Sequence, residues 1–272
     1  MITSINKFRE LAEQGVPFIV NHSAGKDSQA MTLLLRSIVP ANQLIVVHAH
    51  LPGMEWPGVI EHIQSTTEGL AFHKVTAQYA DGSQKTFQNM VKKRGMFPSP
   101  AQRWCTSDLK RAPIEKFIRA FARESGATTI VNCLGLRAGE SRNRANADVV
   151  KYNTRLTTKS RTVIDWLPIH HYSTADVFNA IDEAGQKPHW AYAAGASRLS
   201  CALCIMASDK DLAIGAKHNP EVFKQVSRLE RQVKHTLRQP TKRRPAPYLE
   251  TIIPEVSMAF FAQHDLFEAE KK

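Results

Sequence analysis

The chain has 272 residues, of which 43% are hydrophobic, enough to bury a sizeable core in one domain with an appended piece. No apolar run is long enough to cross a bilayer, and residues 1–15 are polar and partly acidic, which excludes a signal or transit peptide, so we expect a cytoplasmic protein without membrane contact. The net charge of +11 favours an anionic substrate or a polyanionic partner, and the four cysteines favour metal binding or redox chemistry over a disulfide framework.

Apolar runs alternate with stretches of helical periodicity along the chain. We predict helices at residues 4–14, 26–35, 57–67 and 173–181 and after a cap at Thr106 or Ser107, and strands at 18–22, 44–48, 71–77, 128–134 and 163–169. Residues 81–104 are less regular, with 92–95 and 97–100 marking loops. Alternation of strands with helices predicts an α/β fold, a Rossmann-like parallel sheet flanked by helices.

Residues 23–28, Ser-Ala-Gly-Lys-Asp-Ser, join the first strand to the following helix. Gly25 permits a tight turn close to a ligand, Ser23 and Ser28 offer hydroxyls, and the start of the helix offers unpaired N–H groups to an anion beside the charge of Lys26. The loop is too short for the Gly-x4-Gly-Lys-Ser/Thr motif of ordinary NTPases. The pattern therefore favours a phosphate site, with an ordinary strand-to-helix turn as the alternative.

This loop resembles the Ser-Gly-Gly-Lys-Asp-Ser signature of the PP-loop ATP pyrophosphatase superfamily, whose members bind pyrophosphate and often adenylylate a substrate. The resemblance implies that ATP with Mg²⁺ binds at the loop and that two of its residues, Lys26 and Asp27, are catalytic. The implied nucleotide-binding residues are Ser23, Ala24, Gly25, Lys26, Asp27 and Ser28. Ala24 replaces the middle glycine of the signature, and we expect its φ to be negative because a methyl group disfavours positive φ.

Residues 135–144 follow the strand at 128–134, and the carboxyl ends of parallel strands meet at one edge of a sheet, so we expect this loop and residues 23–28 to face one cleft. The planar guanidinium groups of Arg137, Arg142 and Arg144 suit phosphate or sulfate. Glu140 can hold an arginine in place or bind ribose. Solvated arginines are the alternative.

The pattern Gly135-x-Arg137-x-x-Glu140-Ser141-x-x-Arg144 resembles the second signature of the phosphoadenylyl-sulfate reductase family within that superfamily. Residues 166–169, 173–177 and 195–201 extend the resemblance over most of the chain. It implies nucleotide contacts from this loop and a catalytic role for Arg137. The implied contacts are Gly135, Arg137, Glu140 and Arg144. We expect residues 1–165 to form the PP-loop nucleotide-binding domain and residues 166–272 a C-terminal extension with a basic helical tail.

Cys201 and Cys204 have the Cys-x-x-Cys spacing of metal and cluster sites, and Cys105 lies beside Arg103 directly before a predicted helix, a setting that favours a thiolate. Cys133 lies within an apolar strand and reads as a core residue. Three converging thiols could hold a cluster with one open iron, while a zinc site, a dithiol pair and unconnected buried cysteines are the alternatives. The set Cys105, Cys201 and Cys204 resembles that of PP-loop sulfurtransferases acting on DNA or tRNA, which implies a 4Fe–4S cluster as cofactor.

Three functions follow as hypotheses. The first is an ATP-dependent sulfurtransferase that adenylylates an acceptor, releases pyrophosphate and takes sulfur from a donor protein or sulfide. A nucleic-acid acceptor would be tracked by basic residues such as Lys92, Lys93, Arg94, Arg243 and Arg244. The second is reduction of adenylyl sulfate or its 3′-phosphate, although the sequence has no cysteine after Cys204 to match the C-terminal Glu-Cys-Gly-x-His of such reductases. The third is a nucleotide- or nucleic-acid-binding module with a structural metal. A homodimer is compatible with all three.

Overall fold

The computed structural model describes residues 2–240 and 246–254 of the chain. These residues pack into two compact units that interleave along the sequence. Of the described residues, unit 1 comprises 2–50, 58–75 and 111–189, and unit 2 comprises 51–57, 76–110, 190–240 and 246–254. The sequence predicted a single division after residue 165, and that division of domains stays a prediction.

Unit 1 is built on a six-stranded sheet whose order is β3-β2-β1-β4-β6-β5. The strands are β1 Phe18–Asn21, β2 Leu44–Ala49, β3 Ala71–Val75, β4 Thr129–Leu134, β5 Val150–Tyr152 and β6 Thr162–Trp166. All neighbouring pairs are parallel except β5 with β6. This confirms the predicted Rossmann-like fold. The sequence analysis missed β5, because three residues are too few to give a strand pattern.

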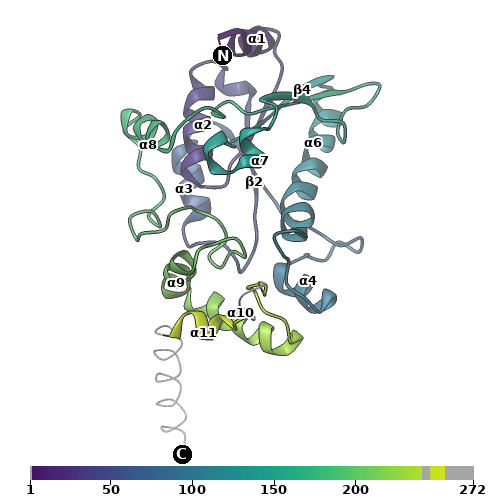
Figure 1. Cartoon of the computed structure of the whole chain (residues 1–272). Helices are drawn as coiled ribbons and strands as arrows, with labels where there is room; N and C mark the ends of the chain where they lie inside the picture. Colours follow the sequence, from purple (N-terminus) through teal and green to yellow (C-terminus); the bar gives the residue numbers. More distant parts are fainter. Residues whose placement is uncertain (1, 241–245, 255–272) are drawn as a thin grey trace, which may run out of the picture. The chain divides into compact units, whose positions relative to one another are not determined.

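Helices cover both faces of this sheet (Figure 1). They are α1 Ile2–Glu13, α2 Lys26–Arg36, α3 Val59–Thr66, α6 Ala112–Ser125, α7 Arg142–Ala145 and α8 Thr174–Glu183. On one face, Ile118 and Ala122 of α6 pack with strand residues such as Ile19 and Ile130. On the other face, α2 packs against α8 through an apolar contact of Ala30. Within the described residues, every helix is too short or too polar to cross a membrane.

The sheet order places the two predicted site loops side by side. β1 and β4 are neighbours, although the chain leaves β1 toward β2 on one side and leaves β4 toward β6 on the other. In open α/β sheets, the usual ligand position is at the carboxyl ends of the strands where the direction of winding reverses in this way. Residues 22–25 follow β1 and residues 135–144 follow β4, so the topology alone brings them to one edge.

Unit 2 is mainly helical. It contains α4 Phe87–Arg94, α5 Trp104–Thr106, α9 Asp209–His218, α10 Pro220–Val233 and α11 Leu249–Ile252, and a π-helical turn, η2 Ser107–Arg111, follows α5. Buried aromatic and aliphatic residues such as Phe87, Trp104 and Phe223 form its core. The carboxylate of Glu230 accepts hydrogen bonds from the N–H groups of Leu237 and Leu249, which holds the chain after α10 and the start of α11 in place.

Two local predictions in this region were wrong. Residues 92–95 were expected to be loop, but Lys92–Arg94 form the last turn of α4, which Thr86 caps and Gly95 ends with φ of 65°. Basic side chains suit a helix C-terminus, where they meet the negative end of the dipole. A helix start was expected at Thr106 or Ser107, but helical structure already begins at Trp104.

Gly215 of α9 packs directly against the loop that carries Cys201 and Cys204. A Cβ atom at this position would lie 2.0 Å from the carbonyl oxygen of Ala202, far inside van der Waals contact. That carbonyl belongs to buried backbone, because Ala202 and Leu203 are almost inaccessible to solvent. The absence of a side chain at residue 215 therefore sets how closely the cysteine loop approaches the helix.

We expect Gly215→Ala to lower the free energy of unfolding by about 1–3 kcal/mol, because the overpacking cost exceeds the helix-propensity gain of about 1 kcal/mol. Urea unfolding followed by circular dichroism measures the change. Gly139→Ala is the matched control, since a Cβ there meets no atom within 4 Å. A Gly215→Ala protein as stable as the wild type would show that the loop relaxes freely away from α9.

Candidate functional site

The loop between β1 and α2 is held by its own hydrogen bonds. The Ser28 hydroxyl donates to the carbonyl of Gly25 at 2.8 Å and accepts from the N–H of Ser23 at 3.2 Å. Gly25 is the N-cap of α2 and provides no side-chain cap, so the first N–H groups of this eleven-residue helix point to the loop without a capping oxygen. The predicted strand, loop and helix are therefore present. The Ser28 hydroxyl forms its hydrogen bonds within the loop.

Ala24 adopts the backbone conformation that the sequence analysis excluded. Its φ is +62°, in the left-handed region, and it is fully buried. The expectation of a negative φ was wrong, because in this turn the left-handed conformation directs the N–H of Ala24 to the side chain of His22. This N–H donates to Nδ1 of His22 at 3.1 Å, and His22 is itself buried. Burial lowers the pKa of His22 to about 3, so this imidazole is neutral and free to accept that hydrogen bond.

Asp27 joins the two loops. Its Oδ2 atom lies 2.9 Å from Nζ of Lys26, and its Oδ1 atom lies 2.5 Å from Nε of Arg137, which follows β4. Both cationic side chains are almost completely buried, whereas Asp27 keeps a small exposed fraction. Arg137 also donates to the carbonyl of Tyr172 at 3.2 Å. Two predicted catalytic cations thus share one carboxylate.

The second loop is braced by Glu140. Its Oε2 atom accepts from the N–H of Arg137 at 2.9 Å and pairs with the guanidinium of Arg144, so of the two roles predicted for Glu140 the structure displays the bracing of an arginine. Gly135 lies against the first loop, since a Cβ there would come within 3.2 Å of the backbone of Ser28. Arg142 begins α7 and is exposed.

This arrangement can accommodate an anion. Lys26 and Arg137 bring two positive charges against one negative charge on Asp27, next to the N-terminus of α2. Charge-assisted hydrogen bonds from such groups are the usual means of holding phosphate. The sequence analysis did not identify His22 or Tyr172 as supports of the loop. The only signal for His22 was its position directly before Ser23, and Tyr172 takes part through its backbone, which carries no residue-type signal.

The three cysteines proposed as ligands lie together in unit 2. Cys105 in α5 and the Cys201/Cys204 pair are free thiols, partly buried, and pack against the same hydrophobic core. They also interact electrostatically with one another. The loop around the pair is fixed by hydrogen bonds from the N–H of Ala202 to the carbonyl of Met54 and from the N–H of Met206 to Sγ of Cys204.

Lys110 of η2 interacts electrostatically with all three thiols, with Cys201 as the largest influence on it. Burial raises the pKa of Cys201 to about 11 and also raises the pKa of Cys105, while the positive charge of Lys110 lowers both. The expected thiolate at Cys105 was therefore wrong for the protein as it stands, because desolvation outweighs nearby positive charge. Cys133 is fully buried in β4, as predicted for a core residue.

Replacing Asp27 with asparagine tests the bridge between the two loops. We expect Asp27→Asn to lower the free energy of unfolding by about 2 kcal/mol or more, because two nearly buried cations lose their shared carboxylate. We also expect inorganic pyrophosphate to raise the thermal midpoint of this variant more than that of the wild type, since the anion would replace the lost charge. Asp182→Asn, at an exposed position of α8, is the control, and equal pyrophosphate shifts in all three proteins would argue against an anion site.

Comparisons with known proteins give two curated relatives of uncharacterized function. The chain is 26% identical over 190 residues to a protein of Methanocaldococcus jannaschii, covering 69% of this chain and 36% of that protein. It is 31% identical over 147 residues to a 37.8 kDa protein of Escherichia phage 186, covering 54% of this chain and 43% of that protein. The matches thus span less than half the length of these relatives.

Solved structures with a similar fold include the phosphoadenylyl-sulfate reductase of Candida auris, at 13% identity and a TM-score of 0.42 over 68% of this chain and 80% of that chain. They also include the U34-tRNA thiolase of Methanococcus maripaludis with its [4Fe-4S] cluster, at 14% identity and a TM-score of 0.41 over 91% of this chain and 89% of that chain.

Residues 17–207 match the model of the phosphoadenosine phosphosulfate reductase domain. This range is more than half of the chain, and it contains the two loops at the edge of the sheet and all four cysteines. The chain therefore belongs to the phosphoadenosine phosphosulfate reductase domain family.

Proposed function

We propose that this chain is an ATP-dependent sulfurtransferase that adenylylates an acceptor and then replaces the adenylate with sulfur. The observation that carries the proposal is the meeting of Cys105 with Cys201 and Cys204, which are distant in the sequence, near the cation of Lys110. A chain that only bound nucleotide would have no need to gather three thiols in this way.

The nucleotide part of the proposal uses the loop after β1. ATP phosphates would lie at the N-terminus of α2, with Lys26 and Arg137 providing positive charge. As an acceptor oxygen attacks the α-phosphorus, the bond from that phosphorus to the bridging oxygen breaks and pyrophosphate leaves. Lys26 and Arg137 would stabilise the charge that develops on the departing group. The bridge through Asp27 would hold both cations in position before ATP arrives.

The second half of the proposed reaction needs no oxidant. Sulfur at the oxidation level of sulfide attacks the activated carbon of the acceptor, the carbon–oxygen bond to the adenylate breaks, and AMP leaves. The electrons balance, because the sulfur brings an electron pair to the carbon and AMP leaves with the electron pair of the broken carbon–oxygen bond.

The thiol set fits an iron–sulfur cluster. Three soft ligands are free, partly buried and close enough to interact, and Lys110 offsets the negative charge that three thiolates and a cluster carry. Because burial favours protonated thiols, binding of metal would release protons from Cys105 and Cys201. When bound, a cluster with three cysteine ligands would supply an iron able to hold a sulfur atom. The residues that would hold it are Cys105, Cys201 and Cys204.

The family name favours a second candidate, reduction of phosphoadenylyl sulfate. In that reaction a thiolate of the protein attacks the sulfonate sulfur, and the bond from that sulfur to the oxygen of the nucleotide phosphate breaks. An external dithiol then releases sulfite and regenerates the thiol, supplying the two electrons of the reduction and becoming a disulfide. Incubation with phosphoadenylyl sulfate and a dithiol reductant in the absence of ATP separates the two candidates. Sulfite release would favour the reductase, and its absence together with ATP cleavage would favour the sulfurtransferase.

ATP cleavage tests the nucleotide half directly. We expect AMP and pyrophosphate as products, and we expect Lys26→Gln to slow their release by about 100-fold, the typical loss when one charge-stabilising donor is removed. Gly135→Ala should slow it as well, because its methyl group would press on the backbone of Ser28. Lys74→Gln on exposed β3 is the control. Products of ADP and phosphate, or nucleotide left intact, would contradict the proposal.

Iron content tests the cysteine half. We expect anaerobically purified protein to contain iron and acid-labile sulfide and to absorb broadly in the visible range, and we expect Cys105→Ser, Cys201→Ser or Cys204→Ser to lose most of both. Cys133→Ala should retain them, since Cys133 lies in the sheet of unit 1. Zinc in place of iron, or equal loss in the Cys133→Ala control, would overturn the assignment.

A further inference from the structure

Ala24 has a backbone conformation that its side chain disfavours. It lies in residues 23–28, called here the phosphate loop, and its φ of 62° is in the left-handed region. A methyl group at such a φ lies close to the following carbonyl oxygen, which lowers the population of the conformation about 10-fold or more relative to glycine. Ala24 is also fully buried, so water does not stabilise the turn. Another contact within the fold must therefore offset this cost.

The imidazole of His22 provides that contact. The N–H of Ala24 can only donate, so Nδ1 of His22 accepts at 3.1 Å and the ring proton lies on Nε2. His22 is 2% exposed, and its Nε2 atom has no hydrogen-bond partner in the part of the chain that the structure describes. An apolar side chain would fill the same space without burying an unsatisfied polar group. The hydrogen bond at Nδ1 is therefore what a histidine contributes here.

The backbone of His22 is tied to the neighbouring strand β2. Its N–H donates to the carbonyl of Val47 at 3.0 Å, and its carbonyl lies 2.8 Å from Nδ1 of His48. Because a carbonyl can only accept, Nδ1 of His48 carries a proton and donates it to this hydrogen bond. Both backbone polar groups of His22 are thus held by β2. The position of the imidazole is set by the sheet and not by the loop that it supports.

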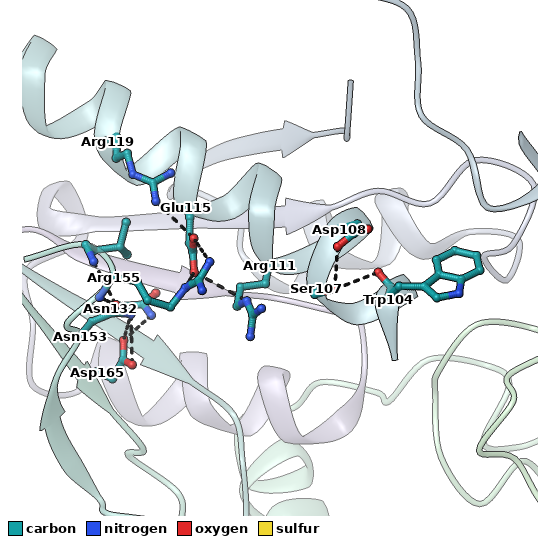
Figure 2. Close-up of polar contacts among 11 residues, drawn as sticks. Trp104, Ser107, Asp108, Arg111, Glu115, Arg119, Asn132, Asn153, Arg155 and Asp165 are labelled. Atoms are coloured by element: carbon teal, nitrogen blue, oxygen red, sulfur yellow. Dashed lines mark hydrogen bonds and ion pairs between the residues drawn. The ribbon is translucent and has the colours of Figure 1, made fainter. Parts of the chain in front are cut away.

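The residue before His22 is anchored across the sheet as well. Nδ2 of Asn21 donates to Oδ1 of Asn132 at 2.7 Å and to the carbonyl of Cys133 at 2.9 Å. Nδ2 of Asn132 in turn donates to Oδ1 of Asp165 in β6 at 2.7 Å, a contact that Figure 2 shows. Side-chain hydrogen bonds therefore join the base of the phosphate loop to β4 and β6. Such a fixed base lowers the ordering cost of binding a ligand.

We propose that His22 is a positioning residue of the phosphate loop, whose Nδ1 atom offsets the cost of an alanine where the superfamily signature has glycine. By holding the N–H of Ala24, the ring keeps the loop in the turn that leaves the N-terminus of α2 open to an anion. The ring acts through the loop and does not itself contact the nucleotide. The inference rests on the proposed function, because the anion is the pyrophosphate part of ATP.

The affinity for inorganic pyrophosphate, measured on the full chain by isothermal titration calorimetry, tests this role. We expect His22→Ala to weaken binding about 10-fold, because the penalty on the turn is no longer offset and fewer molecules have the competent loop. His22→Asn should restore most of the affinity, since Oδ1 of asparagine is as many bonds from Cα as Nδ1 of histidine and accepts hydrogen bonds. His22→Gln, whose oxygen corresponds to Nε2, should not restore it.

Glycine at residue 24 should make His22 dispensable. Ala24→Gly removes the methyl group that disfavours positive φ, so in that background His22→Ala should weaken pyrophosphate binding much less and lower the thermal midpoint less. Lys234→Gly is the matched control, because Lys234 also has a positive φ, of 54°, but lies at the end of α10. In the Lys234→Gly background, His22→Ala should keep its full effect. A ring that only filled space would give the same loss in every background.

Nitrogen-15 NMR of histidine-labelled protein reports the ring protonation. Burial lowers the pKa of His22 to about 3, so at pH 5 we expect a neutral ring with its proton on Nε2. The signal is assigned by its absence from the His22→Asn spectrum. A proton on Nδ1 would exclude the hydrogen bond from Ala24 and overturn the proposal.

Three binding results would also overturn the proposal. These are full affinity in His22→Ala, equal losses with and without Ala24→Gly, and no pyrophosphate binding to the wild type. Release of AMP and pyrophosphate from ATP is measured on the same preparations. A loss in His22→Ala that Ala24→Gly cancels, without any ATP cleavage, would reject the proposed reaction and leave the positioning role standing. ATP cleavage that His22→Ala leaves unchanged would reject the positioning role alone.

Discussion

The carboxylate of Asp27 is the interaction on which the arrangement of the two site loops depends. It pairs with Lys26 of the loop after β1 and with Arg137 of the loop after β4, both of which are nearly buried. Burying two cations is costly unless a counter-charge accompanies them. The sheet topology brings the loops to the same edge, and the close approach at Gly135 removes the space between them. Topology places the loops, and charge pairing then fixes them.

The cysteine site also depends on a partner of opposite charge, but there the thiolates are negative and the partner must be positive. Burial favours neutral thiols at Cys105 and Cys201, and the positive charge of Lys110 only partly offsets that preference. A metal or cluster would supply the remaining positive charge and make the thiolate form stable. The tight contact at Gly215 holds the Cys201/Cys204 loop against α9. The protein thus keeps the ligands close together without needing them to be charged in advance.

An excess of positive charge occurs both at Asp27 and at Glu115. Lys26 and Arg137 share one carboxylate, and three arginines surround Glu115 of α6 (Figure 2). In each case two or three cations share one carboxylate, so the group carries more positive than negative charge. Positive charge that the fold does not neutralise is available to a phosphate-bearing ligand, which explains how a chain with a net charge of +11 can concentrate that charge locally.

The sequence by itself determined the features that depend on neighbouring residues. Alternating apolar runs gave the parallel strands, and the motifs at residues 23–28, 135–144 and 201–204 were found because short spacings carry their own geometric requirements. The capping box at Ser173 was likewise predictable, since its hydrogen bonds join residues three positions apart.

Only the tertiary structure decided the features that depend on burial or on partners far along the chain. The positive φ of Ala24 is imposed by the surrounding turn, and the protonated state of Cys105 follows from desolvation that no local pattern reports. The pairing of β5 with β6 and the convergence of Arg155 on Glu115 both join segments whose residues give no sign of each other. Sequence periodicity records which side of an element faces the core, whereas the balance of charge and solvation at a site depends on every element that reaches it.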